Sequence, residues 1–213
     1  MSEVIVTVRG EHERRVAPEF AEIQVVVRVD GPERGPVVEA ATRRAEPLTD
    51  DLIAAQRSGE VVEYSSGRIS VWAERPWNSE GRQLPPVHHA AIEISATYRD
   101  FGALSWWIGE IADVDGVEIA SVGWTLSPET RVRVEQEVAA EAVDVAVQRA
   151  SAYASALGLS TVAAREVADV GLLDGHGETA SAPKMMRAMA ADSSGPAVKL
   201  QPADILVTAA VDA

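Results

Sequence analysis

The sequence predicts an α+β protein, because strand-like and helix-like patterns of apolar residues both recur along it. Residues 22–29 alternate between apolar and polar positions, as a strand with one buried face does. Within residues 128–158, alanine recurs every fourth position from Ala142 to Ala154, which predicts a long helix with a small-residue face. Hydrophobic residues make up 46% of the chain but aromatic ones only 5%, so we expect a core of aliphatic side chains.

These patterns predict one domain spanning residues 1–213. In it, a mixed, largely antiparallel sheet is packed by two long helices, about 33–57 and 128–158, and one short helix, about 100–112. We expect residues 173–199, which are rich in Gly, Ala, Ser and Met, to form a flexible loop.

The first elements are expected to be strands. Residues 4–9 alternate, Gly10 is expected to break the run, and a second strand begins near Arg15. In the helix that follows, Pro47 predicts a kink or a short break near residues 43–47, because proline removes one backbone hydrogen bond.

Three strands are predicted next, at about 60–64, 67–76 and 88–98, with a turn at Ser66-Gly67. In the last of them one face is predicted to be buried and the other polar. The apolar face consists of Ala90, Ile92, Ile94, Ala96 and Tyr98.

The helix boundaries carry capping signals. Asp100 suits the N-cap of the short helix, and Ser127-Pro128-Glu129 is typical of a helix start. Gly158 suits the left-handed residue that ends the long helix. Strands are expected near 161–172 and again from Ile205 to Val211.

Charge and composition exclude several classes of function. The formal net charge is −14, and no cluster of Lys or Arg is present, so we expect neither nucleic acid nor an anionic membrane as a partner. The chain has no cysteine, which excludes thiolate chemistry and cysteine-bound metal centres. The first residues show no signal peptide and no run suits a spanning helix, so a cytoplasmic location is expected.

The predicted order of elements and three local motifs resemble the SIMPL-domain family. The first is Gly10 followed by Ala17-Pro18-Glu19-Phe20-Ala21, and the second is the alanine-spaced helix that ends in Tyr153-Ala154 and Leu157-Gly158. The third is the closing strand, residues 200–207. The chain departs from many relatives in having no export signal and in carrying His88-His89 where an aromatic residue is common. The resemblance implies an α+β fold and, by analogy with periplasmic relatives, ring-like self-assembly or a role in stress defence, with no established reaction.

Candidate chemical sites are few. His88 and His89 are metal-ligand or acid–base residue types, but neighbouring strand residues point to opposite faces, so we interpret them as structural or surface residues. Asp113, Asp115 and Glu118 lack the remaining ligands of a calcium loop and are interpreted as a solvated turn. Asp174-Gly175-His176 has no accompanying nucleophile and is interpreted as a tether. No catalytic, metal-binding or cofactor-binding residue is therefore predicted.

Two features suit a contact surface. If Trp107 packs inward on the short helix, Trp106 is left exposed, as a docking residue or as a cap on the sheet edge. Met185, Met186 and Met189 suit an adaptable docking patch, or else hold the loop in place.

The leading hypothesis is a non-enzymatic protein that forms a homo-oligomer through strand edges and the small-residue face of the long helix. One alternative is a small-molecule binding module with a pocket under residues 173–199. Another is a metal-dependent or hydrolytic enzyme, for which no complete set of residues is found.

Overall fold

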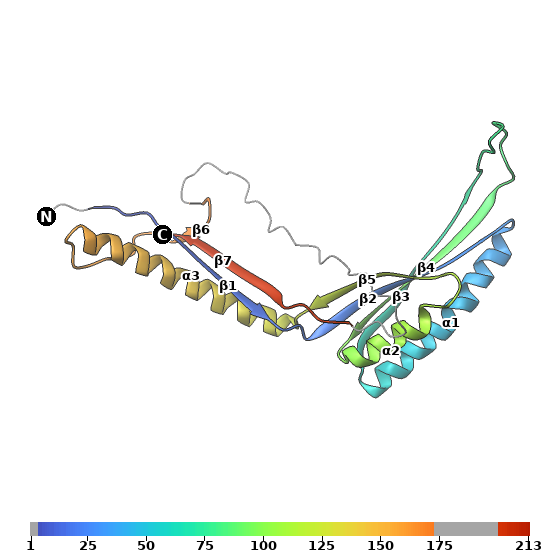
Figure 1. Cartoon of the computed structure of the whole chain (residues 1–213), viewed down its shortest axis with the longest axis horizontal. Coiled ribbons are helices and arrows are strands. Elements are labelled where there is room, and N and C mark those ends of the chain that lie inside the picture. The colour runs from blue at the N-terminus through green and yellow to red at the C-terminus, as the bar shows by residue number, and fades with distance from the viewer. Residues whose placement is uncertain (1–3, 173–199) are drawn as a thin grey trace. The chain divides into compact units, whose positions relative to one another are not determined.

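The computed structural model describes residues 4–172 and 200–213 (Figure 1). The elements are β1 (Arg9–Val16), β2 (Phe20–Gly31), α1 (Arg34–Ser58), β3 (Val61–Glu74), β4 (Val87–Tyr98), α2 (Phe101–Ile111), β5 (Val117–Thr125), α3 (Pro128–Ala156), β6 (Ala168–Asp169) and β7 (Ile205–Asp212). The α+β class and the positions of the three predicted helices are confirmed. The strands form two antiparallel sheets, however, where the sequence predicted one: β1-β7-β6 and β3-β4-β2-β5.

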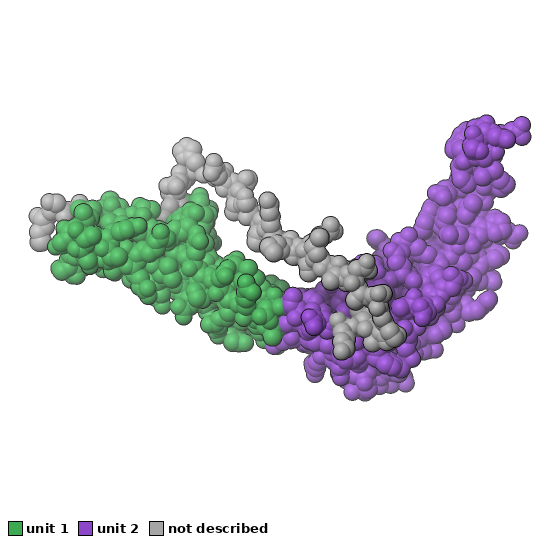
Figure 2. Space-filling view, viewed as in Figure 1, with its two compact units in different colours: residues 1–17, 126–191, 204–213 green, residues 18–125, 192–203 purple. Residues whose placement is uncertain are grey.

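The contacts divide the chain into two compact units, coloured separately in Figure 2. Among the described elements, unit 1 contains β1, α3, β6 and β7, and unit 2 contains β2, α1, β3, β4, α2 and β5. The organisation of residues 1–213 as a single domain stays a prediction.

In unit 2, α1 and α2 cover one face of the four-stranded sheet (Figure 1). Strand β2 lies between β4 and β5, and its alternate residues Ile23, Val25 and Val27 are almost fully buried. Ile94 and Tyr98 of β4 face the same core, as the alternation predicted. In the described part of the chain the opposite face of this sheet carries no helix (Figure 1), and the side chains of β2 that point to it include Glu22, Gln24 and Arg28.

Helix α1 runs without a break from Arg34 to Ser58, with Pro47 inside it, so the predicted break at 43–47 is wrong. Its apolar face holds it in place on both sides of the proline: Val37, Ala41, Ala45, Leu48 and Leu52 are all buried. Packing of this face offsets the hydrogen bond that the proline cannot make.

Strand β3 passes through Gly67 as one strand, so the turn predicted at Ser66-Gly67 is wrong. Its register against β4 shifts between Ser66 and Arg68, which is a β-bulge. A glycine signal that suited a turn therefore marks an irregularity inside a continuous strand.

In unit 1, α3 packs closely against β1. A Cβ atom at Gly10 would overlap the carbonyl oxygen of Ala142 and would stand 2.6 Å from the backbone nitrogen of Ala146. Gly10 therefore lies inside β1, where the sequence predicted a break, because only a residue without a side chain permits this approach. Ala142 and Ala146 of α3 lie in the same contact and are 0% exposed, so these two side chains already pack within the chain. The use of the small-residue face in subunit contacts stays a prediction.

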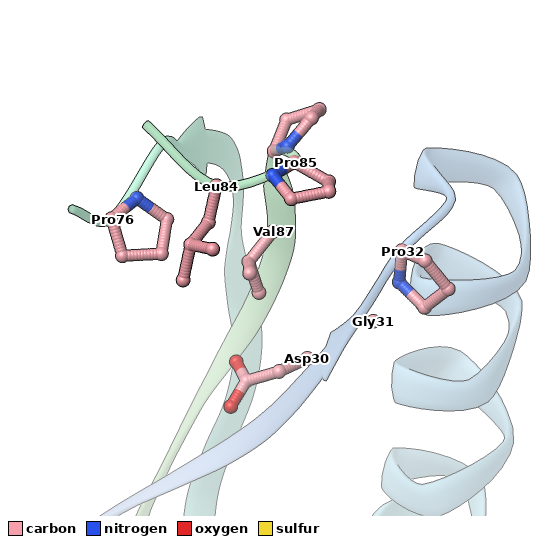
Figure 3. Close-up of a pocket in the computed structure, with 8 residues that line it drawn as sticks. Asp30, Gly31, Pro32, Pro76, Leu84, Pro85 and Val87 are labelled. Atoms are coloured by element: carbon pink, nitrogen blue, oxygen red, sulfur yellow. The ribbon is translucent and has the colours of Figure 1, made fainter. Parts of the chain in front are cut away.

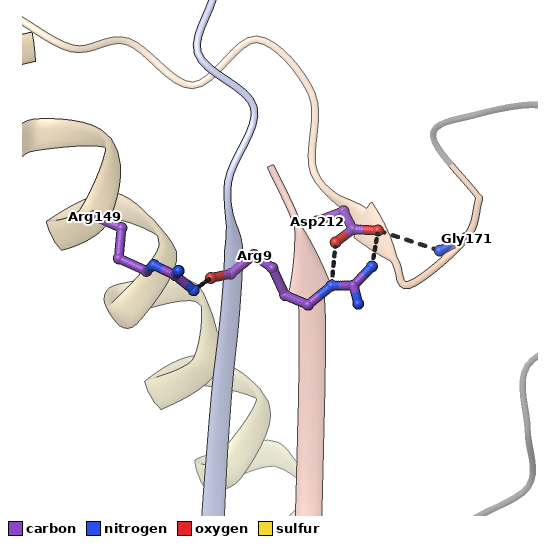
Figure 4. Close-up of polar contacts among 4 residues, drawn as sticks. All are labelled: Arg9, Arg149, Gly171 and Asp212. Atoms are coloured by element: carbon purple, nitrogen blue, oxygen red, sulfur yellow. Dashed lines mark hydrogen bonds and ion pairs between the residues drawn. The ribbon is translucent and has the colours of Figure 1, made fainter. Parts of the chain in front are cut away.

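The two ends of the described chain meet in unit 1. Val8 and Ala213 exchange two backbone hydrogen bonds, each 2.9 Å long. Figure 4 shows the side chains that reinforce this pairing: the Arg9 guanidinium donates to both oxygens of Asp212, at 2.7 and 3.2 Å, and Arg149 donates to the Arg9 carbonyl oxygen. Asp212 also accepts from the Gly171 N–H at 3.2 Å.

The helix ends follow the predicted capping signals. The Ser127 hydroxyl accepts a hydrogen bond from Thr130 N–H at the start of α3, and Asp100 accepts from Gly102 and Ala103 at the start of α2. Gly158 is left-handed, with φ 73°, and ends α3 as expected.

Two segments differ from the sequence predictions in extent. The strand predicted at 161–172 is reduced to the two residues of β6. The predicted loop 173–199, with Met185, Met186 and Met189, lies outside the described residues. No helix in the described part of the chain is long and apolar enough to cross a membrane.

Candidate binding site

A cavity with a volume of about 630 Å³ lies between α1 and α2 in unit 2. We call it the α1–α2 cleft. Four of its lining residues carry carboxylates and three are aromatic: Asp51, Glu60, Asp100 and Glu110, with Tyr98, Trp106 and Trp107.

Backbone hydrogen bonds bring these residues together from three elements. Gly59 ends α1 in the left-handed conformation, with φ 85°, and turns the chain toward β3. The Glu60 carbonyl oxygen then accepts hydrogen bonds from Arg99 N–H at 2.8 Å and from Asp100 N–H at 3.4 Å. The end of α1 is thereby fixed beside the start of α2.

The charges of the α1–α2 cleft are not neutralised within the described part of the chain. None of Asp51, Glu60, Asp100 and Glu110 forms an ion pair with another described residue. Asp100 does accept two hydrogen bonds, at 2.8 and 3.1 Å, as the N-cap of α2. The last turn of α1 and the first turn of α2 both line the cleft, so the two helix dipoles act there with opposite signs.

The two tryptophans of α2 divide as the helical spacing predicted. Trp107 is 4% exposed and packs against Tyr98, with 5.9 Å between ring centroids, while Trp106 is 67% exposed. The Trp107 Nε1–H is buried and finds no hydrogen-bond partner among the described residues. A buried donor of this kind normally has a partner, so it needs an explanation. The role of Trp106 as a contact residue stays a prediction.

Tyr98 connects the core with the cleft. Its side chain is 1% exposed and also lines the cavity. Burial, followed by the negative charges of Glu60 and Asp51, raises the pKa of the Tyr98 phenol well above its ordinary value. The phenol is therefore neutral and a hydrogen-bond donor at physiological pH.

His89 belongs to a separate polar cluster on the helix-free face of the sheet. Its Nδ1 lies 2.7 Å from Asp30 Oδ1, its Nε2 lies 3.5 Å from Glu74 Oε1, and its ring stacks on Trp72. At 3.5 Å, the contact with Glu74 is an ion-pair distance rather than a made hydrogen bond, and His89 Nε2 has no other partner among the described residues.

No set of three His, Asp or Glu residues in the described part of the chain is arranged to hold a metal ion. The acids around Gly116 have other partners, since Asp115 pairs with Arg44 at 3.1 Å and Glu118 with Arg28 at 3.3 Å. These ion pairs favour the interpretation of a structural turn.

A second hollow, about 420 Å³ in volume, lies beside the far end of the β3–β4 hairpin. Figure 3 shows Pro76, Leu84, Pro85 and Val87 on the hairpin side, with Gly31 and Pro32 across from them. Its wall is largely apolar, and its carboxylate, Asp30, is already engaged by His89. This hollow therefore has few polar or charged groups that could select a ligand.

Of the residues that line the α1–α2 cleft, the sequence identified only Trp106 as a candidate for a functional role. The four carboxylates were missed because they lie far apart along the chain, on α1, on the turn after it and on both ends of α2. The capping role of Asp100 was the one signal at these positions, and it identified a helix start without any hint of a cleft.

Comparisons with known proteins identify a family but assign no activity. A crystal structure of a protein from Burkholderia cenocepacia, described as a proposed amidohydrolase/peptidase, is similar at 16% identity and a TM-score of 0.23. That similarity covers 72% of this chain and only 35% of the other, so this chain spans about a third of its length, and a TM-score this low carries no argument. Among curated proteins none matches the chain. The model of the SIMPL family, described as a protein of unknown function (DUF541), matches residues 6–213, and the chain therefore belongs to this family.

Proposed function

We propose that this protein is non-enzymatic and self-associates by pairing the outer edge of β3 with the same edge of a second copy. The observation that carries the proposal is the position of β3. It is the first strand of the β3-β4-β2-β5 sheet, and its outer edge is unpaired among the described residues. An edge strand presents a row of free N–H and C=O groups, which a strand of another chain satisfies.

The segment Arg68–Glu74 is the part of β3 best suited to this pairing. It follows the last bulge and keeps a regular register with β4 from Arg68 to Glu74. Its apolar side chains are unusually exposed for a sheet, with Ile69 at 52% and Trp72 at 44%. Exposed apolar side chains on a regular edge favour a protein contact.

The charges of the segment are self-complementary. When two copies pair antiparallel about a two-fold axis at Val71, Arg68 of each copy lies opposite Glu74 of the other. Trp72 then lies opposite Ser70, and the two Trp72 side chains become diagonal neighbours on one face. A two-fold contact of this type uses the same surface on both copies, as most homodimers do.

The test is the molar mass in solution, measured by size-exclusion chromatography with light scattering at micromolar concentration. The wild type is expected to exceed the monomer mass. Arg68→Glu places two carboxylates opposite one another at both ends of the contact, and we expect it to weaken association by about tenfold. The double variant Arg68→Glu/Glu74→Arg restores the opposite charges and is expected to recover the wild-type mass.

Arg43→Glu is the matched control, because it makes the same charge change on the exposed surface of α1, away from β3. A wild type that is a strict monomer at micromolar concentration would contradict the proposed self-association. A double variant that stays folded but fails to recover association would contradict the proposed register of the β3–β3 contact.

A further inference from the structure

The α1–α2 cleft concentrates negative charge without a counterion in the described part of the chain. Asp51, Glu60 and Glu110 line one cavity without an ion-pair partner among the described residues, and like charges that lie near one another repel. Arg57 and Arg99 are close in sequence, but neither lines the cavity, and the Arg99 guanidinium stands over the Phe20 ring at 5.8 Å. A bound cation would relieve the repulsion.

The exposed indole of Trp106 lines the same cavity as the carboxylates. The face of an indole attracts cations, most strongly the organic cations that shed water easily. A small hard ion such as Mg²⁺ keeps its waters and gains little from such a face. The combination of indole and carboxylates therefore favours an ammonium or guanidinium group over an inorganic ion.

A second and independent observation comes from the wall of the cavity. Trp107 lines the cavity and is only 4% exposed. Its Nε1–H has no hydrogen-bond partner among the described residues. Tyr98, also in this wall, is a neutral donor whose pKa is raised first by burial and then by the cleft carboxylates of Glu60 and Asp51. Donors at the wall of an acidic cavity suit a ligand that carries an acceptor oxygen beside its cation, as a peptide carbonyl does and as a fully protonated polyamine does not.

We propose that the α1–α2 cleft is a binding site for an organic cation, recognised by Asp51, Glu60 and Glu110 as counterions and by the Trp106 indole face. The cation is an ammonium or guanidinium group. Two sources share this chemistry: a free polyamine, and a Lys or Arg side chain of a basic peptide. The site goes beyond self-association, because none of its residues belongs to β3.

The experiment is isothermal titration calorimetry of the full chain at near-physiological ionic strength. Spermidine and a capped tri-arginine peptide are the two probes, and MgCl₂ at equal ionic strength is the inorganic comparison. We expect saturable binding of one probe molecule per chain. Saturation with spermidine identifies a free polyamine as the source, and saturation with the peptide alone identifies a basic side chain.

Variants locate the binding. Asp51→Asn and Glu110→Gln each remove one exposed counterion, and we expect each to weaken binding by about threefold and the pair together by about tenfold. Trp106→Ala is expected to weaken binding by a similar factor through loss of the indole face. Glu39→Gln is the matched control, since it removes one exposed carboxylate from α1 outside the cleft and is expected to leave binding unchanged.

Three results would overturn the site. They are the absence of saturable heat with either probe, equal competition by MgCl₂, and an equal loss of affinity in Glu39→Gln and Glu110→Gln. The last two would mean diffuse attraction to an acidic protein. Repeating the titration on Arg68→Glu separates this site from the β3 contact, because binding must persist there whatever the molar mass.

Discussion

At the scale of single residues, Tyr98 shows how a side chain can belong both to a core and to a surface cavity. Its ring packs with Trp107 in the core under α1 and α2, and its side chain also lines the α1–α2 cleft. Burial and the negative charges of two nearby carboxylates both oppose ionisation of the phenol. The consequence is a dependence of stability on alkaline pH.

The sign of that dependence follows from the raised pKa. In the unfolded chain the phenol titrates near its ordinary pKa of 10.0, while in the folded protein it stays protonated to a higher pH. The contribution of Tyr98 to the free energy of unfolding is therefore complete below pH 10. It is lost as the pH rises toward the folded-state pKa, at about 1.4 kcal/mol for each pH unit.

We predict that Tyr98→Phe removes this loss. Urea unfolding at a series of pH values from about 8 to 11 would measure the free energies of unfolding of both proteins. The difference between variant and wild type is expected to be constant at the acidic end of the series and to shift in favour of Tyr98→Phe at the alkaline end. A difference in the free energy of unfolding that stays constant across the whole pH series would contradict a raised pKa of Tyr98.

At the scale of elements, the structure shows which sequence signals were overridden by packing. Helix α1 is the plainest case, since the packing of its buried apolar face keeps the helix continuous through Pro47. The carbonyl four residues before the proline still lacks its usual backbone donor, so the helix retains a local weakness.

We predict that Pro47→Ala raises the free energy of unfolding by about 1 to 2 kcal/mol. Alanine restores one hydrogen bond and removes a clash, and the gain is reduced by the greater freedom of the unfolded chain. Chemical denaturation measures the change, and Glu46→Ala, at the neighbouring exposed position, is the control. A destabilised Pro47→Ala variant would mean that the packing of α1 depends on the shape that the proline imposes.

The elements with several agreeing signals were predicted well. Helix α3 was bounded by Ser127-Pro128 at its start and by Gly158 at its end, and it runs from Pro128 to Ala156. Strand β4 was predicted from five alternating apolar residues, and its buried face is the predicted one. Local periodicity and capping chemistry suffice where the element buries one continuous face.

The glycines were the main source of error, because the reason for a glycine often lies in a distant part of the chain. Gly10 was expected to break a strand, but it is inside β1 because the backbone of α3 passes too close for a side chain. Gly67 was expected in a turn and lies at a bulge of β3. The α1–α2 cleft has the same character, since only the pairing of Glu60 with Arg99 and Asp100 gathers its carboxylates.

At the scale of the whole molecule, two units with separate buried clusters predict more than one unfolding transition. The cluster of Val8, Ala142, Ala146 and Val211 belongs to unit 1, and the main cluster around Ile23, Leu52 and Leu104 belongs to unit 2. Differential scanning calorimetry is expected to resolve two transitions.

Gly10→Ala assigns the transitions. The new methyl group would push α3 from β1, and we expect it to destabilise unit 1 by about 3 kcal/mol or more while the transition of unit 2 keeps its temperature. Gly35→Ala is the control, because a Cβ at Gly35 meets nothing within 4 Å. A single transition that moves as a whole in Gly10→Ala would instead support the prediction of one cooperative domain.

The hydrogen bonds between Val8 and Ala213 also set an order of events during synthesis on the ribosome. The elements of unit 2, from β2 to β5, form one uninterrupted stretch of the chain, so they are translated together and have all their partners early. Strand β1 is translated before them, yet its partner β7 follows all of them and α3 as well. The nascent β1 must therefore remain without its strand partner while unit 2, α3 and β7 are translated, and an unpaired strand is open to wrong contacts during this interval.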